Sequence, residues 1–182
     1  QDANYETWKP ERIRAYPEMI WQLGFNGIQV DECRGYGSVH GEELTRVRRA
    51  VQTVSKGAKD YRMYVSFSQW GDCLFVEGET FSWNNPKERQ VMVDFMKDLA
   101  KAYAPTSDNV VIRIGDPGGC TRDGCDFYKT PQQITAAFLQ EFRRVNPSVT
   151  GTLSVWANSA LWLYAPRRLD MSNYGPMFPD MA

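Results

Sequence analysis

Carboxylate side chains recur just after the apolar runs of this sequence, where folded chains often place reactive groups. The clearest case is Asp116, which follows the run 109–115 and begins a loop rich in glycine and cysteine. The acids that follow earlier apolar runs are Asp31, Glu32 and Asp72. Two carboxyl groups at one site can supply a proton donor and a base or nucleophile for cleaving a glycosidic bond. Alternatively, these acids are ordinary loop residues, since Asp116-Pro-Gly-Gly consists of turn formers.

Aromatic and amide side chains accompany the acids. The chain has 6 Trp and 9 Tyr residues, and part of this aromatic content must belong to the core. The flat apolar face of an exposed ring can also stack on the C–H face of a pyranose, and an amide can bind a sugar hydroxyl. We therefore predict Asp116, Glu32 and Asp72 as catalytic residues. The predicted substrate-binding residues are Asp31, Trp70, Trp83, Trp156, Asn158 and Trp162.

All four cysteines, Cys33, Cys73, Cys120 and Cys125, lie in the same loops as the acids. Cys120 and Cys125 are close enough in sequence to close a small disulfide loop. Cys33 can pair with Cys73 if the two preceding strands are neighbours. An even number of cysteines with local pairing favours an oxidising compartment, so we expect disulfides and a secreted or periplasmic protein. The alternatives are free thiols or a zinc site of four thiolates, or of three with His40, although the usual Cys-x2-Cys spacing is absent.

Apolar periodicity and turn residues predict helices that alternate with strands. The expected helices span residues 10–23, 42–56, 85–103 and 130–145. The expected strands span residues 25–30, 63–68, 110–114 and 152–156. Asn85-Pro86 with Glu88, and Thr130-Pro131 with Gln133, are typical helix starts, and Gly57 is expected just past the end of its helix.

Regular alternation predicts an α/β fold with parallel strands joined by right-handed helical crossovers. Four strands can form a small open sheet or one half of a (β/α)8 barrel, which usually needs about 250 residues when complete. We expect part of such a barrel, a partial TIM barrel with four β/α units. Residues 1–182 are expected to form a single α/β domain, with a fragment of a larger barrel as the alternative, and residues 165–182 are unassigned. The carboxyl ends of parallel strands share one edge, so the acids should gather there.

Composition excludes several classes of protein. The chain has 182 residues, of which 42% are hydrophobic and 24% charged, as in globular domains. A net charge of −1 without a basic stripe argues against a nucleic-acid-binding protein. No apolar stretch approaches the roughly 18 residues of a membrane span, so we expect no membrane partner. The sequence shows no signal peptide and begins at Gln1, as a mature or trimmed product could.

The order of these motifs resembles that of α-glucuronidases and related hexosaminidase-like (β/α)8 glycoside hydrolases. The segment Tyr16–Val30 is similar to a helix and the following strand of that family, and Tyr64–Trp70 is similar to the next strand. The helix start at Asn84–Arg89 and the strand Val110–Asp116 continue the resemblance, which covers residues 10–160. It implies a glycosidase that acts on a carbohydrate substrate through acid/base carboxylates and needs no organic cofactor.

One departure from the family pattern concerns the proton donor. The family places a glutamate directly after the position of Asp116, whereas this chain continues with Pro117, Gly118 and Gly119. Only Asp116 is therefore carried over as a catalytic candidate. Two further hypotheses remain open: a non-catalytic carbohydrate-binding protein on the same scaffold, and a zinc-stabilised protein with four cysteine ligands.

Overall fold

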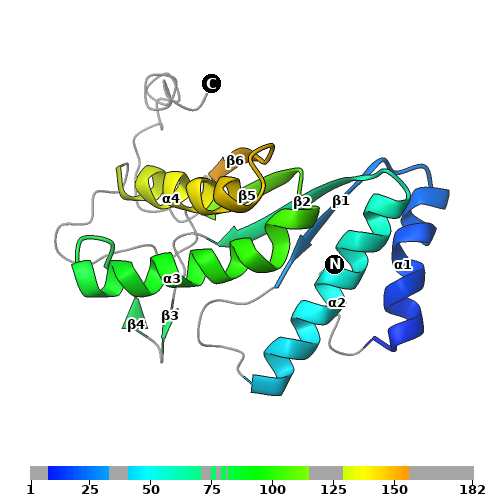
Figure 1. Ribbon diagram of the computed structural model, residues 1–182, viewed down its shortest axis with the longest axis horizontal. Helices are drawn as coiled ribbons and strands as arrows, with labels where there is room; N and C mark the ends of the chain where they lie inside the picture. The colour runs from blue at the N-terminus through cyan, green and yellow to red at the C-terminus, as the bar shows by residue number, and fades with distance from the viewer. Residues whose placement is uncertain are drawn as a thin grey trace, which may run out of the picture.

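The computed structural model describes residues 8–32, 41–70, 75–76, 79–80, 82–114 and 129–155. Its main sheet has four parallel strands in the order β1-β2-β5-β6, which confirms the predicted parallel architecture. These strands are β1 (Gly27–Asp31), β2 (Tyr64–Trp70), β5 (Asn109–Ile114) and β6 (Thr150–Val155). The helices are α1 (Pro10–Gln22), α2 (Gly41–Asp60), α3 (Pro86–Tyr103) and α4 (Lys129–Val145), with a short 3-10 helix, η2 (Ala104–Thr106) (Figure 1).

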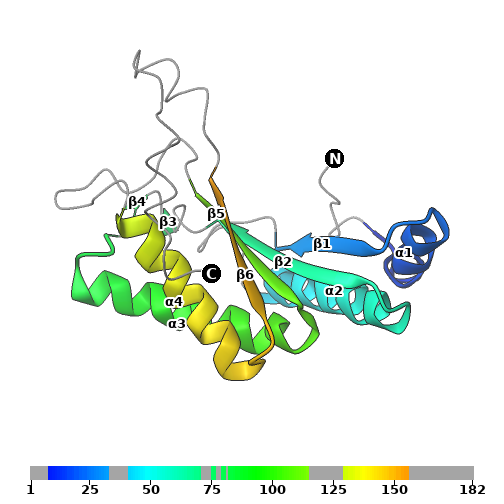
Figure 2. The ribbon, with the colours of Figure 1, turned by 90° about the horizontal axis from the view of Figure 1, so that it is seen from above.

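The helices α2, α3 and α4 lie on one side of this sheet (Figure 2). Helix α1 packs against α2 near β1. Each of the three covering helices connects two neighbouring parallel strands, as in a right-handed βαβ crossover. None of the described helices covers the opposite side of the sheet. The described residues therefore form a two-layer structure with one helical layer and one sheet.

The hydrophobic core lies between the sheet and this helical layer. Alternate strand residues point into it, because successive side chains of a strand face opposite sides. The strand residues in the core include Ile28, Val30, Val65, Phe67, Val110 and Ile112. Phe67 is fully buried and stacks on Tyr103 of α3 at 4.3 Å and on Phe142 of α4 at 5.7 Å between ring centroids. These aromatic contacts join two helices to one central strand.

The other side of the sheet carries the remaining strand side chains, and we call it the polar face. The described side chains on it are Gln29, Asp31, Tyr64, Ser66, Ser68, Asn109, Val111, Arg113, Thr150, Thr152 and Ser154. Barrel interiors are usually filled by bulky branched residues, but Val111 is the only such residue in this set. An apolar partner layer would leave many of these polar groups without hydrogen bonds. The composition of the polar face therefore favours polar partners over a second apolar layer, also at its buried residues Ser68, Asn109 and Val111.

Two helix boundaries show how tertiary contacts modify sequence signals. The predicted cap at Asn85 is confirmed, because its side chain accepts hydrogen bonds from the backbone N–H groups of Lys87 and Glu88. Gly57 was expected just past the end of a helix, but this prediction is wrong, since α2 continues to Asp60. A Cβ atom on Gly57 would lie 3.0 Å from Cγ of Pro17 in α1. The glycine therefore allows the close approach of α1 to α2 instead of ending a helix.

Two other differences are small. Helix α4 begins at Lys129, so Thr130 lies within the first turn instead of preceding it as the N-cap. The loop expected at residues 74–84 contains two short antiparallel strands, β3 (Phe75–Val76) and β4 (Glu79–Thr80). Helix boundaries commonly differ by one or two residues, and a two-residue strand has too few positions to show a period.

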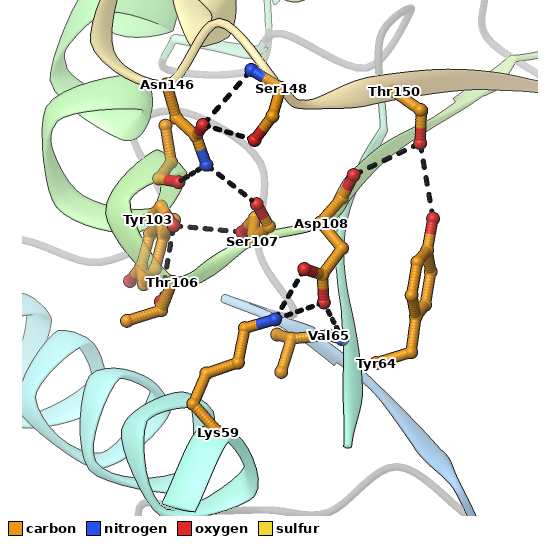
Figure 3. A network of polar contacts seen from close by, with 11 residues as sticks. Lys59, Tyr64, Val65, Tyr103, Thr106, Ser107, Asp108, Asn146, Ser148 and Thr150 are labelled. Carbon is orange, nitrogen blue, oxygen red and sulfur yellow. Dashed lines mark hydrogen bonds and ion pairs between the residues drawn. The ribbon is translucent and has the colours of Figure 1, made fainter. Parts of the chain in front are cut away.

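Polar contacts hold the sheet together at its amino edge (Figure 3). The Asp108 carboxylate accepts a hydrogen bond from the backbone N–H of Val65 at 2.8 Å and forms an ion pair with Lys59 of α2. The Asp108 carbonyl accepts a bond from the Thr150 N–H at 3.0 Å, so this residue connects β2 to β6. Asn146 donates to the carbonyls of Ala104 and Ser107 at 3.0 and 3.1 Å. This edge has a structural role and lies opposite the predicted site.

No helix among the described residues is both long and apolar enough to cross a membrane.

Candidate functional site

The carboxyl ends of the four parallel strands define the edge where the sequence placed its candidate residues. Asp31 is the last residue of β1, Glu32 follows it, and Trp70 is the last residue of β2. The remaining candidates lie outside the described residues: Asp72, Asp116, Trp156, Asn158, Trp162, Cys33, Cys73, Cys120 and Cys125. Asp72 and Asp116 are each the second residue after a strand end, and their strands β2 and β5 are paired. As catalytic residues that share one site, Asp72 and Asp116 stay a prediction.

Asp31 and Glu32 are adjacent in sequence but lie on opposite sides of the sheet. Asp31 pairs in register with Ser68 and belongs to the polar face, where it is half-buried. Glu32 follows Ile28 and Val30 on the side that faces the helices and is 5% exposed. The alternation of a strand therefore separates two acids that the sequence presented as one cluster.

Glu32 takes part in a buried polar network that connects β1 to two helices. Its Oε1 atom accepts a hydrogen bond from Arg48 Nε of α2 at 2.7 Å and another from the Tyr103 hydroxyl of α3. Arg48 also forms an ion pair with Asp98 of α3. A carboxylate engaged in this way is poorly placed to exchange protons with a substrate on the polar face. The arrangement favours a structural role for Glu32 over the catalytic role predicted from sequence.

The electrostatics of this network keep both donors protonated. Burial of the phenol and the negative charge of Glu32 raise the pKa of Tyr103 well above its ordinary value. Burial by itself would lower the pKa of Arg48, but the hydrogen bonds and charges of Asp98 and Glu32 outweigh it and raise that pKa. Tyr103 and Arg48 thus donate to Glu32 throughout the physiological pH range.

Of the four tryptophans predicted to bind sugar, Trp83 is the one whose side chain the structure describes. Its indole is 7% exposed and belongs to the hydrophobic core. Little of the ring face is left for a sugar, so its burial favours a packing role. The backbone of Trp70 ends β2, in register with Arg113 of β5. As a sugar-binding residue, Trp70 stays a prediction.

The sequence interpretation overlooked two residues at the carboxyl end of the polar face, Ser68 and Arg113. Both lie inside the predicted strands at residues 63–68 and 110–114. The available signal was the alternation of the strands. Because Phe67 and Ile112 face the core, Ser68 and Arg113 must face the other side.

The described residues contain no group of three or more His, Cys, Asp or Glu side chains that could hold a metal ion. All four cysteines of the zinc hypothesis lie outside these residues, so the choice between zinc and disulfides stays a prediction.

Comparison of the chain with protein-family models gives no match, and comparison with curated proteins gives none either. Solved structures do match. Two crystal structures of GH5_18 from Streptomyces cattleya, one in complex with Manβ1-4GlcNAc and one with GlcNAc, each align with a TM-score of 0.55. They share 13% and 14% sequence identity with this chain. The alignments cover 82% of this chain and 40% of each GH5_18 chain.

The described chain has the fold of a partial (β/α)8 barrel. Its fold is like that of the two GH5_18 structures, and the chain spans less than half of their length. The catalytic domain of the major endoglucanase from Xanthomonas campestris pv. campestris is also similar, with 15% identity and a TM-score of 0.45. That alignment covers 80% of this chain and 48% of the endoglucanase domain.

Proposed function

We propose that this chain is part of a glycoside hydrolase that cleaves glycosidic bonds in a poly- or oligosaccharide. The observation that carries this proposal is the position of Asp72 and Asp116, each two residues beyond the end of a parallel strand in a partial (β/α)8 barrel. Barrel enzymes place their reactive groups at this carboxyl edge. Asp116 acts as a catalytic carboxylate and Asp72 is its partner, while Glu32 stabilises the fold.

The carbohydrate is bound at the same edge. Asp31 on the polar face accepts hydrogen bonds from sugar hydroxyls, and Trp70, Trp156 and Trp162 offer ring faces to the pyranose. Asn158 binds a further hydroxyl. The GH5_18 structures hold GlcNAc and Manβ1-4GlcNAc, which supports a carbohydrate ligand for a scaffold of this kind. This reaction needs two carboxyl groups and no organic cofactor.

The test is an incubation of the purified 182-residue chain with a panel of defined sugars. The panel contains Manβ1-4GlcNAc, β-1,4-linked and α-1,4-linked glucose oligosaccharides, an aryl β-N-acetylglucosaminide and a glucuronic-acid-substituted xylo-oligosaccharide. Mass spectrometry of the products should show shortened oligosaccharides or released monosaccharide from at least one substrate. Cleavage of the aryl β-N-acetylglucosaminide would support the relation to hexosaminidases that the order of motifs suggests. Release of glucuronic acid from the substituted xylo-oligosaccharide would support the relation to α-glucuronidases.

The second candidate is a carbohydrate-binding protein without catalytic activity on the same scaffold. It is favoured by the Pro117-Gly118-Gly119 sequence, which replaces the glutamate that the related hydrolases use as proton donor. This alternative predicts saturable binding of a panel sugar, with quenched tryptophan fluorescence and no product after long incubation. Absence of both binding and cleavage would contradict both candidates.

We further propose that the cysteines form disulfides in an exported protein. The strands β1 and β2 are neighbours, which meets the condition for pairing Cys33 with Cys73. Alkylation under denaturing conditions should leave the mass unchanged before reduction and add four alkyl groups after it. Four groups added without reduction would exclude disulfides. A native mass excess of one zinc ion, lost on denaturation, would instead favour the four-thiolate site.

A further inference from the structure

The polar face differs along its length in how its side chains are hydrogen-bonded. Near the amino edge, Asn109 donates to Thr152 Oγ1 at 3.1 Å and accepts from Thr150 Oγ1 at 3.1 Å. The Tyr64 hydroxyl lies 3.2 Å from the same Thr150 oxygen. These side chains satisfy one another across β2, β5 and β6. This part of the polar face needs no ligand to complete its hydrogen bonds.

Ser68, closer to the carboxyl edge, is different. Its side chain is 1% exposed, and its Oγ atom is the only buried side-chain nitrogen or oxygen among the described residues that lacks a hydrogen-bond partner. Phe67, the preceding residue of β2, points into the core. Because successive side chains of a strand face opposite sides, the Ser68 hydroxyl points to the polar face. A buried hydroxyl without a partner costs about 1–3 kcal/mol, and such a group in a folded protein calls for an explanation.

The neighbours of Ser68 have complementary chemistry. Asp31 is its register partner on β1, and Val111 is its partner on β5. Arg113 lies two residues beyond Val111 on the same side of β5, so its long side chain starts from the next pleat toward the carboxyl edge. The carboxylate thus lies directly across from the hydroxyl, and the guanidinium belongs to a residue two positions further toward the carboxyl edge on the other neighbouring strand. Together these groups include an acceptor, a group that can donate or accept, and several donors, and Asp31 and Arg113 each also take part in other interactions of the folded chain.

We propose that Asp31, Ser68 and Arg113 form a binding site for the hydroxyl groups of a pyranose ring. This inference rests on the proposed function and adds residues within the sheet to the loop residues already named. Adjacent sugar hydroxyls can donate to the Asp31 carboxylate and accept from Arg113, and one of them completes the hydrogen bond of Ser68. The ligand supplies the partner that the folded chain leaves out at this position. The alternative is a permanently bound, buried water molecule that forms the missing hydrogen bond of the Ser68 hydroxyl.

The substitution Ser68→Ala separates these alternatives through two measurements. If a sugar supplies the partner, removing the hydroxyl should raise the Kd of a bound sugar about 3- to 10-fold, as expected for one hydrogen bond. In the absence of sugar the melting temperature should stay the same or rise, because an unsatisfied buried hydroxyl has been removed. The probes are N-acetylglucosamine, Manβ1-4GlcNAc and cellotetraose, titrated into the full 182-residue chain by calorimetry.

Two matched serine variants serve as controls. Ser66→Ala changes the same strand and the same face nearer the amino edge and should leave the Kd unchanged. Ser107→Ala removes a buried hydroxyl that donates to the Tyr103 carbonyl at 2.9 Å and precedes β5, at the edge of the sheet opposite the proposed site. It should lower the melting temperature by about 2–4 °C, the shift expected for roughly 1 kcal/mol in a domain of this size, without affecting the Kd.

The outcomes distinguish this inference from the proposed function. If the wild type binds a probe and Ser68→Ala binds it equally well, the Ser68 site is wrong while the proposed function stands. A Ser68→Ala variant that melts at a lower temperature without sugar, with an unchanged Kd, would indicate a permanent water partner and also overturn the site. If no probe binds or is cleaved by the wild type, the proposed function fails and the site fails with it.

Discussion

Replacing Asp116 with asparagine is expected to lower the rate of glycosidic bond cleavage by about 10²–10⁴-fold, the usual loss when an acid/base group is removed. Asparagine keeps the size of the side chain but can neither release nor take up a proton in this role. Because Asp116 lies two residues beyond the end of the barrel strand β5 and asparagine has the same size, we expect an effect on chemistry with little effect on folding. The measurement compares kcat/KM of variant and wild type on the substrate cleaved best in the sugar panel.

A matched control for this variant is Asp123→Asn, which changes another acid of the same segment, 115–128. Its kcat/KM should stay within about threefold of wild type, and both variants should keep the wild-type melting temperature. Asp72→Asn should resemble Asp116→Asn, because both carboxyl groups are needed for the reaction. An Asp116→Asn variant that retains activity within about threefold of wild type would show that this residue is not catalytic.

The second large effect is expected from Glu32→Ala, this time on stability. The substitution removes the acceptor of Arg48 and Tyr103 and leaves a buried hydroxyl without its partner. Breaking a buried ion pair typically costs about 3–5 kcal/mol. Arg48 keeps its pair with Asp98 and its side chain is 20% exposed, so we expect the lower end of this range, about 3 kcal/mol. The free energy of unfolding is measured by urea denaturation.

A control for the loss of an acid is Glu11→Ala in α1. Its carboxylate lies 3.9 Å from Arg14 and its side chain is 75% exposed, so its removal should change stability by less than about 0.5 kcal/mol. A double variant of Glu32→Ala with Tyr103→Phe should lose less stability than the sum of the single changes, since both remove the same hydrogen bond. A Glu32→Ala variant with wild-type stability and strongly reduced cleavage would restore the catalytic interpretation of Glu32.

Much of the fold could be predicted because it depends on local periodicity. The run Val110–Ile114, followed by turn residues, and the β-rich segment Tyr64–Ser68 are typical of strands, and both are strands in the structure. The cap at Asn85 depends on residues within one helical turn, so the sequence contains all the information it needs. Alternation of helices and strands then leaves few topologies besides a parallel sheet with helical crossovers.

The failures arise where a contact distant in sequence replaces a local rule. Gly57 has the composition of a helix terminator, but the nearby ring of Pro17 explains the glycine, and the helix continues. Trp83 was predicted to bind sugar because it lies in an aromatic loop segment, and the tertiary structure buries its ring in the core. No pattern within a few residues of either position contains the information about these partners.

For the candidate site, the sequence determined which chemical groups follow the strand ends and therefore which edge of the sheet they occupy. The tertiary structure decided how these groups are divided between the two sides of that sheet. It placed Glu32 among the helices with Arg48 and Tyr103, and it placed Asp31 beside Ser68 on the polar face. The physical reason is that a strand turns successive side chains to opposite sides, while register and helix packing determine which side is buried.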